Sequence, residues 1–147
     1  MSYVNALFHI VICTYQRKPT IPAEFEEDVY RFIWDMLKQR SCRLLRINGI
    51  GNHIHLFIDL KPSIALADLV RDIKACTSGW MRRDFRFHTF EKWSRGYFAA
   101  SVSYSLRDSI IEYIKWQHVH HGVESIDDEM KRLCEEQGMI FHEDSYE

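Results

Sequence analysis

Long hydrophobic runs and closely spaced cysteines are both missing from this sequence. No apolar stretch approaches the roughly 18 residues that a membrane-spanning helix needs, so no membrane partner is expected. The N-terminus shows no basic segment followed by a hydrophobic stretch and a small-residue cleavage site, so no signal peptide is expected. The four cysteines are far apart and form no C-x-x-C pair: Cys13, Cys42, Cys76 and Cys134. This spacing favours reduced thiols in the cytoplasm over a disulfide framework or a thiolate zinc site.

Repeats, low-complexity segments and long linkers are absent as well. The chain has 147 residues, of which 46% are hydrophobic and 14% aromatic. This length and composition suit one globular domain that buries a substantial core of its own.

Positive and negative charges nearly balance over the whole chain, but they are unevenly distributed along it. The net charge is −2, yet residues 1–122 hold 17 Lys and Arg against 12 Asp and Glu, whereas residues 123–147 hold 2 against 9. A mildly basic body therefore precedes an acidic tail. Seven basic residues gather between 71 and 95: Arg71, Lys74, Arg82, Arg83, Arg86, Lys92 and Arg95. Each one alone is best interpreted as solvated surface, but together they predict a phosphate-binding surface.

The hydrophobic pattern predicts four strands and four helices. The expected strands cover 3–15, 42–50, 53–60 and 97–104, and the expected helices cover 25–40, 62–82, 105–121 and 125–137. This order is the split β-α-β arrangement of ferredoxin-like α+β folds, with an antiparallel sheet and two added C-terminal helices. We divide this single domain, 1–147, into a ferredoxin-like core over 1–104, a tyrosine helix over 105–122 and an acidic tail helix over 123–147. The fold alone does not identify the function.

Two histidines stand two residues apart in the expected strand GNHIHLFIDL, residues 51–60. Residues two apart on a strand point the same way, so His53 and His55 share one face while the aliphatic residues between them pack on the core. Two imidazoles on one face can hold a divalent cation. Such a pair also arises by chance, so packing alone stays an alternative. A second pair, His118 and His120, is split by about 200° around a helix and cannot share a metal.

The helix expected after residue 105 carries Tyr113, Gln117 and His120 at i, i+4 and i+7, and therefore on one face. A tyrosine and a glutamine one turn apart place a nucleophile and a possible oxygen ligand in one neighbourhood. The alternatives are an aromatic ring at the edge of the core for Tyr113 and a solvated amide for Gln117.

Taken in order, the motifs NHIHLFI, WSRGYFAASV and EYIKWQ, followed by a double histidine, resemble the single-tyrosine HUH transposases. These small enzymes move insertion sequences as single-stranded DNA, and the REP-associated tyrosine transposases are their relatives. The resemblance covers nearly the whole chain. It implies a DNA strand transferase and endonuclease that acts in transposition.

The resemblance also implies a role for each matching residue. His53 and His55 would ligate a divalent cation, Mg²⁺ or Mn²⁺, with Gln117 as the third protein ligand. Tyr113 would attack the scissile phosphate and leave a 5′-phosphotyrosine and a free 3′-hydroxyl. A tyrosine with a pKa of about 10 needs help to attack at neutral pH, which a cation on the phosphate supplies. Because the covalent link conserves bond energy, no ATP is needed, and no glycine-rich phosphate loop is present.

The partners implied by the resemblance are single-stranded DNA with hairpins and a second copy of the chain. In such a homodimer the tyrosine helix of one subunit can serve the histidine pair of the other. We assign hairpin contacts to the basic residues Arg71, Lys74, Arg82, Arg83, Arg86 and Arg95, with Trp80, Phe87, Phe90 and Trp93 as candidates to stack on bases. Core packing is the better interpretation for Trp80.

The acidic tail departs from what a DNA-handling protein is expected to carry. Its acids include Asp127, Asp128, Glu129, Glu135 and Glu136. We interpret them as a solvated helix face, with shielding of the cleft or contact with the metal region as alternatives. Two other functions stay open: a domesticated single-stranded or hairpin DNA-binding module that no longer transposes, and a small-ligand regulatory domain.

Overall fold

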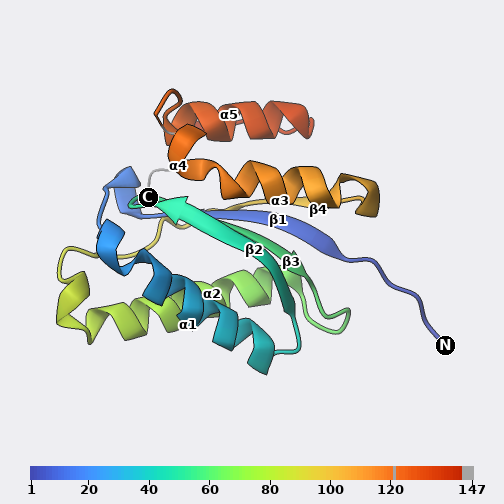
Figure 1. The fold of residues 1–147 in the computed structure, drawn as a ribbon, viewed down its shortest axis with the longest axis horizontal. Helices are drawn as coiled ribbons and strands as arrows, with labels where there is room; N and C mark the ends of the chain where they lie inside the picture. Colours follow the sequence, from blue (N-terminus) through green and yellow to red (C-terminus); the bar gives the residue numbers. More distant parts are fainter. Residues whose placement is uncertain (121, 144–147) are drawn as a thin grey trace.

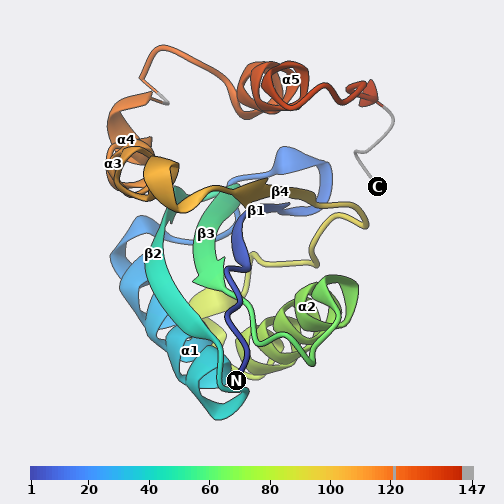
Figure 2. The same ribbon diagram turned by 90° about the vertical axis from the view of Figure 1, so that its right-hand side faces the viewer.

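The computed structural model describes residues 1–120 and 122–143 and places a four-stranded sheet between two layers of helices (Figures 1 and 2). The strands are β1 (Leu7–Cys13), β2 (Arg43–Ile50), β3 (His53–Asp59) and β4 (Phe98–Val102). They lie in the order β2-β3-β1-β4, and each neighbouring pair is antiparallel. The predicted α+β fold with a ferredoxin-like core is confirmed.

Helices α1 (Glu26–Gln39) and α2 (Leu66–Arg82) cover one face of the sheet, as Figure 1 shows below the strands. Strand β3 turns Ile54, Leu56 and Ile58 to these helices, and all three side chains are buried in the main core. Because side chains alternate along a strand, the residues between them face the other side. This is the orientation predicted for the histidine strand.

Helices α3 (Arg107–Lys115), α4 (Gln117–His120) and α5 (Ile126–Glu136) lie over the opposite face. Figure 2 shows α3 and α4 above the β2 side and α5 above the β1 and β4 side. Short 3₁₀ turns occur at Tyr15–Arg17, Ala23–Phe25, Phe85–Phe87 and Tyr104–Leu106. No helix in the described part of the chain is long and apolar enough to cross a membrane.

The helix expected over 105–121 is interrupted at Trp116, so Tyr113 and Gln117 lie on different helices. The cause is a side chain from β2. The Asn48 amide donates to the carbonyl oxygens of Ile114 at 3.1 Å and Lys115 at 3.0 Å, which ends α3 and lets α4 begin in a new direction. The predicted continuation to His121 lies outside the described residues.

A glycine allows the tight pairing of β2 and β3 next to the histidines. Gly49 lies opposite Ile54, and a Cβ at this position would be 2.2 Å from the carbonyl oxygen of His53. Any larger residue would push the start of β3 away from β2. Gly49 therefore helps to hold the His53 backbone in place.

Candidate metal and nucleophile site

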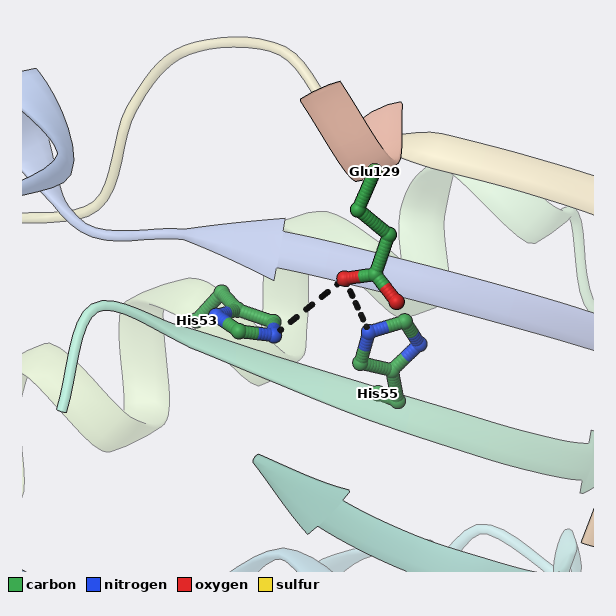
Figure 3. A group of neighbouring side chains, drawn as sticks. All are labelled: His53, His55 and Glu129. Carbon is green, nitrogen blue, oxygen red and sulfur yellow. Dashed lines mark hydrogen bonds and ion pairs between the residues drawn. The ribbon is translucent and has the colours of Figure 1, made fainter. Parts of the chain in front are cut away.

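The two histidines of β3 are wholly buried on the sheet face that α4 and α5 cover. In the antiparallel register, His53 lies opposite Cys13 of β1 and His55 lies opposite Val11. Their imidazoles point toward the tail helix (Figure 3). Burial on this face explains why an apolar strand carries two polar rings: they have partners there.

Glu129 of α5 is the main partner of both rings, and its side chain is also wholly buried. Its Oε1 is 3.2 Å from Nε2 of His55 and 3.6 Å from Nε2 of His53 (Figure 3). Its Oε2 accepts hydrogen bonds from the Gln117 amide at 3.0 Å and from the Tyr113 hydroxyl. One carboxylate therefore connects the histidine pair with the tyrosine and the glutamine.

His53, His55 and Glu129 could hold a metal ion, since they offer one ligand atom each within 4.8 Å of one another. The Gln117 carbonyl oxygen lies 3.1 Å from Nε2 of His53 and adds a possible fourth donor. Two neutral nitrogens, one anionic oxygen and one amide oxygen suit a divalent cation. The buried carboxylate also favours a bound cation, because a buried anion needs compensating positive charge.

The interpretation of the acidic tail as a solvated helix face is wrong for Glu129. Helix α5 packs on the sheet with Ile126, Met130 and Leu133, and Glu129 lies on the same side of the helix. An acid inside such an apolar stripe is the sequence signal that could have indicated its burial. Asp127 also turns inward, to Arg17 at 3.3 Å. The interpretation holds for three of the acids, which are exposed: Asp128, Glu135 and Glu136.

Tyr113 is half-buried and has two polar partners from α5. Its hydroxyl donates to Glu129 and accepts a hydrogen bond from the Arg132 guanidinium at 2.7 Å. Burial and the Glu129 carboxylate raise the pKa of Tyr113 well above its usual range, and Arg132 opposes this rise. The phenol therefore stays protonated at neutral pH and needs a proton acceptor or a polarised phosphate to attack.

The nitrogen of His53 that points away from Glu129, Nδ1, is hydrogen-bonded to Asn52. Nδ1 of His53 lies 2.8 Å from Oδ1 of Asn52, whose Nδ2 donates to the Arg17 carbonyl oxygen at 3.3 Å. The second bond sets the orientation of the amide, so its oxygen faces the imidazole. A proton on Nδ1 leaves a lone pair on Nε2, which is the form that binds metal.

His9 of β1 is a member of the site that the sequence did not single out. It is buried, and its Nε2 lies 2.8 Å from Nδ1 of His55. Burial, and then the neighbouring His55, lower the pKa of His9 to about 3, so the ring is neutral. The signal was available, since the strand alternation that turns Phe8 and Ile10 to the core turns His9 to the other face.

Tyr113 and the histidine pair of its own chain share this site, with the Tyr113 and His55 ring centroids 5.9 Å apart. The phenol therefore reaches the imidazoles without a second subunit in this arrangement. The homodimer remains a prediction.

Four of the six predicted DNA-binding residues line a hollow of about 590 Å³ beside α2: Arg71, Lys74, Arg82 and Arg95. Lys92 and Tyr97 line it as well. Arg83 and Arg86 are not among its lining residues, and Arg86 is bound to Asp84 at 2.8 Å. The structure thus brings most of the basic cluster to one surface, here called the α2 hollow.

Lys74 already has a structural role within the α2 hollow. Its ammonium donates to the carbonyl oxygens of Ser94, Arg95 and Gly96 at 2.8, 2.8 and 2.9 Å. Burial lowers the pKa of Lys74. The side chain therefore ties α2 to the loop before β4, and its contact with phosphate remains a prediction.

Three aromatics proposed to stack on bases are buried instead: Phe87, Phe90 and Trp93 belong to the main core. The Trp93 indole donates to the Thr77 hydroxyl at 2.8 Å, which satisfies its polar atom inside the core. Core packing is confirmed for Trp80, which stacks on Phe32. The aromatic ring available at the α2 hollow is Tyr97, which is 42% exposed.

Comparison with known proteins adds an independent finding. The family model described as "Transposase IS200 like" matches residues 2–117. The ISDra2 transposase TnpA of Deinococcus radiodurans is 25% identical over 126 residues, covering 80% of this chain and 88% of that protein. The transposase for insertion sequence element IS200 of Salmonella typhimurium is 23% identical over 118 residues, covering 77% of each chain.

The fold is also similar to that of a solved structure, the REP-associated tyrosine transposase bound to a REP hairpin. The TM-score is 0.64 at 14% sequence identity, and the match covers 87% of this chain and 76% of that one. The range matched by the family model ends before α5, so Glu129 and Arg132 lie outside it.

Proposed function

Because the chain belongs to the family of IS200-like transposases, and is therefore an enzyme that cleaves and transfers DNA strands, we propose that it acts on single-stranded DNA through Tyr113. The observation that carries this proposal is the position of the phenol. The Tyr113 hydroxyl and both imidazoles of the HUH motif are bound to the same buried carboxylate.

In the proposed cleavage step, the Tyr113 oxygen bonds to phosphorus and the bond from phosphorus to the 3′-oxygen breaks. The products are a 5′-phosphotyrosine and a 3′-hydroxyl. Oε2 of Glu129 accepts the Tyr113 hydrogen bond and is placed to take the phenolic proton as attack proceeds. The same proton can return to the leaving 3′-oxygen. Arg132 stabilises negative charge on the phenolic oxygen when rejoining expels it.

The residues that would hold a divalent cation, Mg²⁺ or Mn²⁺, are His53 and His55 through Nε2 and Glu129 through its carboxylate. Gln117, the ligand implied by the family resemblance, lies beside them and can contribute its amide oxygen. When bound, the cation polarises the scissile phosphate and neutralises charge in the transition state. The chain's own contribution is to orient the imidazoles and to exclude water from them.

Hairpin DNA is the proposed substrate. A relative of the same fold is solved with a hairpin, and the α2 hollow collects basic side chains beside an exposed tyrosine. Arg71, Arg82 and Arg95 would contact phosphates, and Tyr97 would stack on an unpaired base.

The test uses hairpin oligonucleotides taken from DNA that flanks the gene, with Mg²⁺, with Mn²⁺ and with EDTA. We expect a covalent protein–DNA adduct that survives denaturing electrophoresis, requires the cation and disappears in Tyr113→Phe. Tyr104→Phe is the matched control, because this tyrosine is 73% exposed and should leave the adduct unchanged. An adduct that persists in Tyr113→Phe would refute the assignment. Hairpin binding without any adduct in either cation would favour a DNA-binding module instead.

A further inference from the structure

His9 is a buried imidazole with no role in the cleavage step above. Its Nε2 meets Nδ1 of His55, while Nε2 of His55 faces Glu129. The two ring planes differ by 23° and their centroids are 5.0 Å apart. With the two nitrogens 2.8 Å apart, the rings meet edge to edge through this hydrogen bond rather than through overlapping faces.

We propose that His9 is a positioning residue that keeps Nδ1 of His55 hydrogen-bonded both before and after a cation binds. Without a cation, Nε2 of His9 donates the hydrogen bond to Nδ1 of His55. With a cation bound, Nε2 of His9 accepts the hydrogen bond instead. The inference rests on the proposed metal site, and it concerns the histidines of this chain rather than the DNA.

Before a cation binds, the carboxylate decides the proton positions. Oε2 of Glu129 accepts two hydrogen bonds, and an ionised Glu129 can only accept at Oε1 as well. His55 must then present an Nε2 proton to Oε1 at 3.2 Å. A neutral His55 protonated at Nε2 has a lone pair on Nδ1. This lone pair accepts a hydrogen bond from the Nε2–H group of His9.

When a cation binds Nε2 of His55, that nitrogen needs its lone pair and the remaining proton must be on Nδ1. His9 must then accept at Nε2 and carry its own proton on Nδ1. The proton in the shared bond moves to His55, Nε2 of His55 releases its proton to solvent, and His9 takes one at Nδ1. Both rings stay neutral, and together they hold two protons in either state.

His53 and His55 both face Glu129 through Nε2 and differ in the group beside Nδ1, which is Asn52 for His53 and His9 for His55. The partner of His53 is an amide oxygen held in place by the Arg17 carbonyl, and this oxygen can only accept. This fixes a proton on Nδ1 of His53, while its Nε2 faces the Gln117 amide oxygen at 3.1 Å and Oε1 of Glu129 at 3.6 Å. A carboxylate or carbonyl oxygen beside Nδ1 of His55 would be repelled by its lone pair in the cation-free state. An imidazole avoids this because its nitrogens can exchange donor and acceptor roles.

The direct test is a long-range ¹H–¹⁵N NMR measurement of the His9 and His55 tautomers, without metal and with saturating Mg²⁺. In the wild type without metal we expect protons on Nε2 of both rings. With Mg²⁺ we expect protons on Nδ1 of both. A His9 tautomer that is the same in the two samples, although Mg²⁺ is bound, would overturn the inference.

A second test measures Mn²⁺ affinity by titration calorimetry in three variants. His9→Phe keeps the ring but leaves the Nδ1 proton of His55 without an acceptor, and we expect about 10- to 100-fold weaker binding. His9→Gln should restore affinity to within about threefold, since an amide can also donate or accept. Leu7→Ala is the control for lost packing, because Leu7 is buried on the same face of β1. We expect it to lower stability without changing affinity.

The outcomes separate this inference from the proposed function. If the wild type binds no Mn²⁺, the metal site fails and the inference fails with it. If the wild type binds Mn²⁺ and His9→Phe binds it equally well, only the inference fails. If His9→Phe does not fold, two measurements still test the inference. One is the Mn²⁺ affinity of His9→Gln compared with that of Leu7→Ala, and the other is the pair of wild-type tautomers measured by NMR.

Discussion

At the scale of single residues, Glu129 defines this site more than either histidine does. Its two carboxylate oxygens have different partners: Oε1 faces the imidazoles, and Oε2 faces the phenol and the amide. A change at Glu129 should therefore affect both metal binding and the state of the nucleophile. The residue comes from a segment whose charge pattern indicated a solvated surface.

We expect Glu129→Gln to weaken Mn²⁺ binding by at least about tenfold, since it replaces an anionic ligand with a neutral one. Calorimetric titration of the purified protein measures this. Glu135→Gln removes the same charge from an exposed position of the same helix and should leave the affinity unchanged. Equal losses in the two variants would mean that net charge, and not ligation, is responsible.

Cys13 provides a pH-dependent prediction. Burial raises the pKa of its thiol to about 11, and the acids Asp127 and Glu129 add to this rise while Arg17 opposes it. The folded state then holds the thiol proton more tightly than the unfolded chain does. The contribution of Cys13 to stability is complete below pH 9 and is lost as the pH rises from about 9 to about 11.

Urea unfolding at pH 8 and pH 10.5 checks this sign. The free energy of unfolding of the wild type should fall by up to about 2 kcal/mol more than that of Cys13→Ala over this range. An identical decrease in both proteins would show that Cys13 does not cause it.

At the scale of elements, α5 contributes two residues to the site and α4 contributes one. The sequence predicted helices at 105–121 and 125–137, and the second of these is confirmed by α5. The break at Trp116 was not predicted, because it depends on the Asn48 amide of β2, which donates hydrogen bonds to two carbonyl oxygens of α3. No local signal between residues 105 and 121 contains that information.

Because α5 holds Glu129, loosening the helix should weaken metal binding even when no ligand is changed. Leu133→Ala removes a buried side chain from the face of α5 that packs on the sheet, and it should cost about 2–3 kcal/mol of stability as well as lowering Mn²⁺ affinity. Val29→Ala creates a similar defect in α1 on the opposite face of the sheet. We expect it to lower stability without lowering the affinity of the folded protein.

Urea unfolding and calorimetric titration of both variants test this coupling. If Leu133→Ala kept the wild-type affinity, the position of Glu129 would not depend on the packing of α5.

At the scale of the whole molecule, the candidate metal site and the α2 hollow lie in different parts of the fold. The metal site lies under α4 and α5, and the α2 hollow lies beside the helix that covers the other face of the sheet. The net charge of −2 conceals this division, since one acid of α5, Glu129, belongs to the candidate metal site. Five of the seven basic residues of 71–95 line the hollow where DNA is proposed to bind.

Hairpin binding should therefore depend on salt through the α2 hollow. Replacing Arg82 with Gln should weaken binding and reduce the slope of log K against log salt by about 0.7–0.9 for each phosphate that the protein no longer neutralises. Arg31→Gln, an exposed position on α1, is the control and should leave the slope unchanged. Fluorescence anisotropy over a range of salt concentrations measures both slopes. Identical slopes for the Arg82 variant and the wild type would place the DNA elsewhere.

The family resemblance implied that Tyr113 and Gln117 lie near His53 and His55. The sequence by itself determined the order of strands and helices and the face of β3 that carries the two histidines. These features follow from periodicities of two and 3.6 residues, which act over a few neighbours along the chain. Only the tertiary structure decided that Glu129 and Arg132 reach Tyr113, that His9 meets His55, and that Asn48 ends α3. These contacts join residues far apart in the chain, and they depend on how helices dock on the sheet. No local spacing encodes that docking.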